Sequence, residues 1–125
     1  MLEQLGYDLM EAVFEVCNEI GYGVVEEFYQ QSLEIELRLR GIPVASRPEL
    51  RLCYKSEPIN KRYAPDFFVF DAIVVELKAV QELISDHEAQ LFNDMRIARL
   101  QVGNLINFGW KGGIQWTRFV LSDLK

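Results

Sequence analysis

The stretch from residue 62 to 80 constrains the fold of this 125-residue chain most strongly. It contains two runs rich in β-branched and aromatic residues, 62–70 and 73–80, and such runs predict two neighbouring buried strands joined by a short turn. The runs also contain Asp66, Glu76 and Lys78. Ionised side chains are almost never fully buried unless they are paired or bind a metal. The three residues are therefore either exposed and incidental or parts of a site.

Three helices are predicted around these strands. Apolar residues recur every three or four positions over residues 2–20, which is the pattern of an amphipathic helix. A second helix is predicted over 24–40, because Gly41 is a typical stop signal. Ser85 and Glu88 fit a capping box at the start of a third helix, over 86–99.

The remaining segments predict further strands. Residues 44–54 alternate as a half-exposed strand does, 55–60 read as a turn, and 101–108 and 113–121 read as two strands around a hairpin-type turn. The order is ααβββαββ, which predicts an α/β (α+β) domain with a mixed sheet of about five strands flanked by helices. No linker or repeat interrupts the chain, so one domain over residues 1–125 is expected.

Composition narrows the function classes. The net charge is −6, whereas proteins that coat nucleic acid by neutralising phosphates are usually basic. Any contact with nucleic acid is therefore expected to be local, metal-mediated or shared with a partner. Cys17 and Cys53 lack metal-binding spacing, and neither a signal peptide nor an apolar run of about 20 residues is present. We therefore expect a cytoplasmic protein with no membrane contact.

The length of the turn between the two central strands decides whether their acids meet. Glu76 and Lys78 are two residues apart, so their side chains share one face of the strand. A two-residue turn places Asp66 opposite Leu77, on the wrong face. A three-residue turn places Asp66 directly opposite Glu76. Only an odd number of turn residues, or a bulge in the first strand, unites the two acids.

Two neighbouring carboxylates repel each other, which raises one pKa or attracts a cation. Mg²⁺ prefers oxygen ligands from one or two carboxylates and keeps several waters. A metal held there can polarise a phosphoryl oxygen, and Lys78 can hold the attacking water or stabilise developing charge. In the alternative interpretation, Glu76 and Lys78 form a solvated pair on an exposed face. Phe68, Phe70 and Val74 make this face apolar, which favours a covering helix instead.

The pair Pro65-Asp66 followed by Glu76-Leu77-Lys78 resembles the motif of the PD-(D/E)XK nuclease superfamily, whose core order is helix, three strands, helix, strand. The segment "GVVEEFY", residues 23–29, has the form GxxExxY. Together with "LEIELRLRGI", "VVELKAV", "HEAQL" and "LINFG", it is similar to the GxxExxY family of small prokaryotic proteins over nearly the whole chain. That likeness does not imply a particular substrate.

The resemblance implies a Mg²⁺ or Mn²⁺ site made by Asp66 and Glu76, with the backbone carbonyl of Leu77 as a further ligand. Lys78 takes the role of catalytic lysine. The implied protein is an endonuclease-like, metal-binding hydrolase that cleaves phosphodiester bonds of DNA or RNA. A homodimer or a larger DNA-processing complex is compatible with this resemblance.

Two auxiliary residues are implied in the same way, Glu26 on the first core helix and Gln90 near the phosphate. Tyr29 lies one turn after Glu26 and is predicted to support it by hydrogen bonding. Glu26 also has a simpler interpretation, as an acid stabilised by the helix dipole. His87, the only histidine, is either a packing residue or a group that supports the site indirectly.

A second function class stays open. The acidic composition also suits a non-catalytic interaction module that keeps the nuclease fold, for instance as a subunit of a DNA-processing assembly. Metal-dependent stabilisation together with strand cleavage distinguishes the enzyme from the module.

Overall fold

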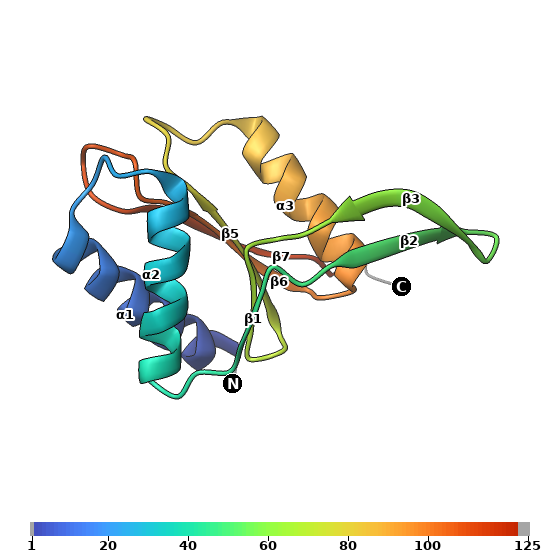
Figure 1. The fold of residues 1–125 in the computed structure, drawn as a ribbon, viewed down its shortest axis with the longest axis horizontal. Coiled ribbons are helices and arrows are strands. Elements are labelled where there is room, and N and C mark those ends of the chain that lie inside the picture. Colours follow the sequence, from blue (N-terminus) through green and yellow to red (C-terminus); the bar gives the residue numbers. More distant parts are fainter. Residues whose placement is uncertain (1, 123–125) are drawn as a thin grey trace.

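A computed structural model of the chain describes residues 2–122, with the backbone alone for residues 61–63. Three helices and seven strands are defined in this part (Figure 1): α1 (Leu2–Ile20), α2 (Glu26–Leu39), β1 (Val44–Ser46), β2 (Leu50–Tyr54), β3 (Glu57–Tyr63), β4 (Phe67–Val69), β5 (Ile73–Lys78), α3 (Ser85–Ala98), β6 (Val102–Asn107) and β7 (Gln115–Val120). None of the helices in the described residues is long and apolar enough to cross a membrane.

Five strands form one mixed sheet in the order β1-β4-β5-β6-β7. The pairs β1–β4, β4–β5 and β6–β7 are antiparallel, whereas β5 and β6 are parallel and are connected through α3. This arrangement confirms the predicted α+β class and the mixed five-stranded sheet. The predicted order ααβββαββ lacked two strands, because five strands rather than three precede α3.

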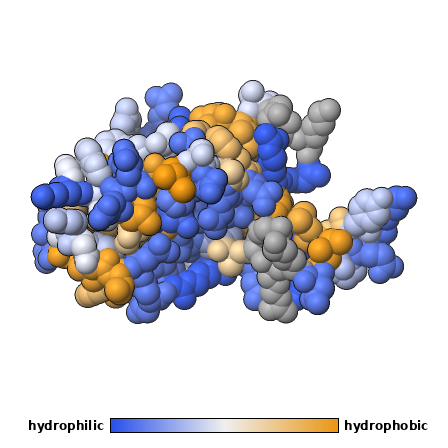
Figure 2. Space-filling model, turned by 90° about the horizontal axis from the view of Figure 1, so that it is seen from above, coloured by the Kyte–Doolittle hydropathy of each residue, from blue (hydrophilic) through white to orange (hydrophobic). Residues whose placement is uncertain are grey.

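The missed strands lie in residues 44–63. The predicted strand over 44–54 is divided into β1 and β2, since Arg47 has a positive φ and Pro48 follows it. The predicted turn over 55–60 was wrong: only Lys55 and Ser56 turn, both with positive φ, and β3 begins at Glu57. Strands β2 and β3 form a separate two-stranded hairpin that extends beyond α3 (Figure 1), and Figure 2 shows this arm with a hydrophilic tip.

Helices cover both faces of the sheet. The larger core joins α1 and α2 to Ile73, Val75 and Leu77, which alternate along β5. The smaller core joins Val74 on the opposite face of β5 to apolar residues of α3 and β6. Burial on both faces explains why β5 reads as an almost continuous apolar run.

Helix α3 lies very close to β6. A Cβ at Gly103 would meet Met95 Sδ at 2.5 Å, so the absence of a side chain at Gly103 allows this approach. Phe70 was expected on the α3 face, but it packs against the larger core, because it has left the strand and takes a φ of 59° in the turn.

The start of α3 differs from the predicted capping box. Ile84 is the N-cap residue, and Ser85 is already the first residue of the helix. The Ile84 amide donates to His87 Nδ1 at 3.1 Å, and the His87 amide donates to the Ile84 carbonyl at 3.0 Å. His87 therefore caps the helix that covers the site.

Candidate active site

The β4–β5 hairpin has the turn length that unites the two acids. Val69 pairs with Ile73, so residues 70–72 form a three-residue turn, and both Phe70 and Asp71 have positive φ. Phe67 pairs with Val75, and continuing this register by one position sets Asp66 opposite Glu76. The turn therefore has the odd number of residues that is needed to set Asp66 and Glu76 on the same face of the sheet.

Asp66 lies directly before β4 and is held at two points. Its carbonyl accepts a hydrogen bond from the Arg47 amide at 2.9 Å. Its carboxylate oxygen Oδ2 accepts one from the Leu77 amide at 2.7 Å. Burial raises the pKa of Asp66 to about 6, although the Leu77 hydrogen bond opposes the increase, and the negative charge of Glu26 adds to it.

Glu76 is the most constrained carboxyl group of the site. It is only 3% exposed, and its Oε1 atom has no hydrogen-bond partner among the described residues. Burial raises the pKa of Glu76 to about 10, and the hydrogen bond to Asp94 and the charge of Asp66 act in the same direction. A buried carboxyl oxygen without a partner lowers the stability of the fold. This oxygen is therefore suited to contact a cation or a hydrogen-bond donor that is not part of the chain.

Asp94 is a member of the site that the sequence reasoning missed. It lies on α3, is 2% exposed and shares a hydrogen bond with Glu76. Burial raises the pKa of Asp94 as well. The available signal was its position between Leu91 and Met95, which form the buried face of α3. A carboxylate on such a face needs a partner.

Lys78 and Gln90 meet at the open side of the site. Lys78 Nζ donates to Gln90 Oε1 at 3.3 Å, which joins the end of β5 to the exposed face of α3. The ammonium charge of Lys78 also lowers the pKa of Asp66, Glu76 and Asp94, against the effect of burial. Lys78 therefore offsets part of the negative charge at this site.

Glu26 is exposed and is the first residue of α2, and its charge raises the pKa of Asp66. Strand pairing and hydrogen bonds thus connect Asp66 to Glu76 and Leu77, and Lys78 to Gln90, whereas Glu26 acts on Asp66 through its charge.

The prediction that Tyr29 supports Glu26 was wrong. The Tyr29 hydroxyl donates to the Gly21 carbonyl at 2.6 Å and accepts from the Val24 amide at 3.3 Å. Its buried ring stacks on Phe108 with ring centroids 4.4 Å apart. Because Tyr29 is thus occupied by the turn before α2, it fixes the chain entering the helix rather than the Glu26 carboxylate.

The donor set fits a divalent cation of the Mg²⁺ type. No group of three or more His, Cys, Asp or Glu residues in the described part of the chain could enclose a metal ion. The site offers two carboxylates and, beside Asp66, the backbone of Leu77, whose amide and carbonyl point to the same side of the strand. Few protein ligands and several waters are what Mg²⁺ prefers.

Glu76→Gln is expected to stabilise the metal-free protein at neutral pH. As pH rises above about 4.5, unfolded wild type loses the Glu76 proton while the folded protein keeps it, so stability falls toward pH 10. Each pKa unit corresponds to about 1.4 kcal/mol, so the variant gains at most about 3 kcal/mol at pH 7. Urea unfolding from pH 4 to 8, with a metal chelator present, measures the difference in the free energy of unfolding between the variant and the wild type. Glu82→Gln makes the same chemical change at an exposed position and is the matched control. If the free energy of unfolding changed with pH in parallel for Glu76→Gln and the wild type, this would contradict the raised pKa of Glu76.

Comparisons with known proteins identify the family and the fold of the chain. The family model of the PD-(D/E)XK nuclease superfamily matches residues 3–119. No curated protein sequence matches the chain significantly. Among solved structures, SSO0001 has a TM-score of 0.64 at 15% identity, covering 76% of this chain and 50% of its own. An alkaline exonuclease from Laribacter hongkongensis has a TM-score of 0.51 at 13% identity, covering 90% of this chain and 69% of its own.

The chain spans half the length of the SSO0001 chain, and at these identities both structures bear on the fold alone. The family model, in contrast, spans almost every described residue, including each of the site residues above. The chain belongs to the PD-(D/E)XK nuclease superfamily.

Proposed function

We propose that this protein is a metal-dependent nuclease that hydrolyses phosphodiester bonds of DNA or RNA in the cytoplasm. The observation that carries the proposal is the position of Asp66 opposite Glu76, with Lys78 on the same face, in a member of a nuclease superfamily. The motif Gly23, Glu26 and Tyr29 further supports its assignment to the GxxExxY branch.

Asp66, Glu76 and the Leu77 carbonyl are the proposed ligands of a Mg²⁺ or Mn²⁺ ion. Nucleases of this superfamily generally use divalent metal ions. When bound, such an ion polarises a phosphoryl oxygen and lowers the pKa of coordinated water. The hydrogen bond that Glu76 donates to Asp94 fixes the carboxyl group of Glu76, and the Leu77 amide fixes that of Asp66. Both proposed ligands are thus held before any ion arrives.

Lys78 is proposed to hold the attacking water and to balance negative charge that grows on the phosphoryl oxygens. Its charge acts on Asp66, Glu76 and Asp94, and its ammonium group donates to Gln90 Oε1 at 3.3 Å. A fixed cation in a partly buried site stabilises such charge more effectively than a solvated one. Gln90 is exposed on α3 and is proposed to contact the phosphate backbone beside the scissile bond.

The GxxExxY motif is proposed to position Glu26 for this site. Gly23 has a φ of 89°, which side-chain-bearing residues rarely adopt, and Tyr29 holds the same turn through Gly21 and Val24. These two residues define where α2 begins, and Glu26 is its first residue. Glu26 then acts on Asp66 through its charge, and the motif is a device for placing one carboxylate.

The alternative function is a non-catalytic module of a larger DNA-processing assembly. The net charge of −6 favours it, because an acidic surface repels phosphates. A dimer or a basic partner subunit reconciles this charge with nuclease activity.

Cleavage by the wild-type protein tests the proposed function. Supercoiled plasmid, single-stranded DNA and single-stranded RNA are each incubated with Mg²⁺ or Mn²⁺, and parallel samples contain EDTA. We expect cleavage of at least one substrate that depends on the metal and stops in EDTA. Metal-dependent thermal stabilisation without cleavage of any substrate favours the non-catalytic module instead.

A further inference from the structure

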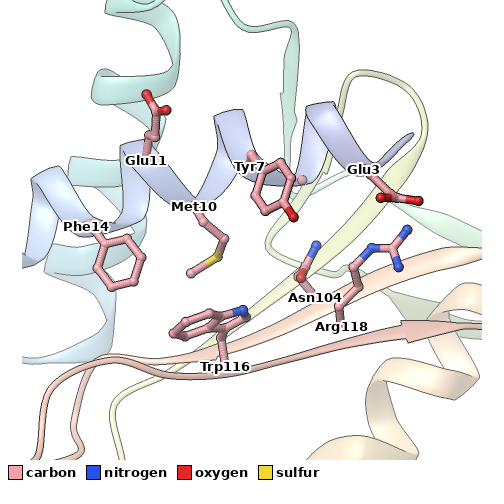
Figure 3. Close-up of a pocket in the computed structure, with 9 residues that line it drawn as sticks. Glu3, Tyr7, Met10, Glu11, Phe14, Asn104, Trp116 and Arg118 are labelled. Carbon is pink, nitrogen blue, oxygen red and sulfur yellow. The ribbon is translucent and has the colours of Figure 1, made fainter. Parts of the chain in front are cut away.

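A cavity of about 570 Å³ lies between α1 and the strands β6 and β7 (Figure 3). It is on the face of the sheet opposite the candidate active site. Asn104, in its floor, pairs with Val75, which faces α1 and α2, whereas Glu76 faces α3. The volume falls within the range of small-molecule pockets. This cavity is therefore separate from the proposed catalytic site.

Asn104 is the feature that marks this cavity as a binding site. Its side chain is 2% exposed, and its Nδ2 atom has no hydrogen-bond partner among the described residues. Figure 3 shows the side chain rising from β6 toward Tyr7. A buried amide donor without an acceptor destabilises a fold, and an acceptor on a bound ligand removes that cost.

Aromatic rings line the same cavity as this donor. Tyr7 and Phe14 on α1 are 65% and 41% exposed, and Trp116 on β7 is 47% exposed. Phe14 and Trp116 are in edge-to-face contact with ring centroids 5.5 Å apart. Figure 3 shows Trp116 below Met10 and Phe14, with Tyr7 farther along α1. Exposed rings gathered in a hollow offer stacking surfaces to a planar ligand.

Arg118 adds a positive charge to the amide donor and the aromatic rings of the cavity. It pairs with Asn104 across β6 and β7, and its guanidinium forms no ion pair with any carboxylate in the described residues. Glu3 and Glu11 also line the cavity. A guanidinium suits a single anionic group, while the two acids repel a long polyanion such as a nucleic-acid strand.

We propose that this cavity binds a small planar aromatic ligand that carries a hydrogen-bond acceptor and one anionic group. Nucleoside monophosphates combine these features. The base stacks on Trp116, a ring nitrogen or carbonyl oxygen of the base accepts from Asn104 Nδ2, and the phosphate pairs with Arg118. Because the cavity lies on the opposite face from Asp66 and Glu76, this proposal does not depend on the nuclease proposal.

Trp116 fluorescence reports on the cavity once the only other tryptophan is replaced in Trp110→Phe. This protein is titrated with AMP, GMP, CMP and UMP, with the four nucleosides and with inorganic phosphate. We expect saturable quenching by at least one monophosphate. The matching nucleoside binds more weakly, and phosphate alone gives no quenching.

Two variants in the same background locate the binding. Asn104→Leu is expected to raise the melting temperature of the free protein and to weaken nucleotide binding at least about tenfold, since it removes the unpaired donor. Arg118→Gln changes an exposed residue and is expected to weaken monophosphate binding while leaving nucleoside binding unchanged. The proposal is overturned if no monophosphate quenches Trp116, or if both variants bind as tightly as their parent.

Discussion

Replacing Lys78 by methionine is expected to lower the rate of nucleic-acid cleavage by at least about 100-fold, which is typical for removing one charge-stabilising group from an active site. The variant retains metal binding, because Lys78 is not a proposed ligand. Removing the ammonium also leaves Asp66, Glu76 and Asp94 in a more negative environment. Metal affinity therefore stays the same or increases while catalysis is lost.

Single-turnover cleavage of the substrate identified with the wild type measures this effect, and a Mn²⁺ titration by calorimetry measures the affinity. Exposed Lys111→Met carries the same chemical change away from the site and serves as control. A Lys78→Met rate within threefold of the wild type would show that Lys78 has no catalytic role.

Asp66→Asn is expected to abolish the stabilisation that a divalent ion gives. A ligand present at 100 times its Kd stabilises the folded state by about 2.7 kcal/mol, which raises the melting temperature of a chain this size by several degrees. The asparagine can still accept the Leu77 hydrogen bond through its amide oxygen, so the metal-free variant stays folded. The Asp66→Asn variant keeps only one of the two proposed ligand carboxylates, that of Glu76. It also lacks the negative charge of Asp66 that attracts the ion.

Thermal unfolding with increasing Mg²⁺ or Mn²⁺ measures the difference. Asp71→Asn is the matched control, because Asp71 lies in the same hairpin but is exposed in its turn. If the metal raised the melting temperature of wild type and Asp66→Asn equally, Asp66 would not be a ligand of the bound ion.

The helices and the central strands could be predicted because their signals are local. Apolar spacing gave α1 its observed bounds, and the two-sided burial of β5 explains its apolar run. The motif around Asp66 and Glu76 predicted candidate site residues, and the structure sets these two acids opposite each other. Their common face was left open, because turns of two and three residues are both common in hairpins.

The remaining features depend on contacts that sequence patterns do not reveal. Phe70 and Asp71 adopt positive φ, although neither is glycine, so the three-residue turn had no signature. Strand β3 contains Pro58 and belongs to an isolated hairpin, which weakens the strand pattern. Asp94 becomes a site residue only because α3 crosses over Glu76, and its role follows from tertiary packing.

The most direct test of the central claim is to locate a bound ion. Crystals of the protein soaked in Mn²⁺ give an anomalous difference map in which manganese is distinguished from water. We predict a peak coordinated by the carboxylates of Asp66 and Glu76. Full manganese occupancy at any other place in the chain, with these two carboxylates uncoordinated, would contradict the proposed metal centre.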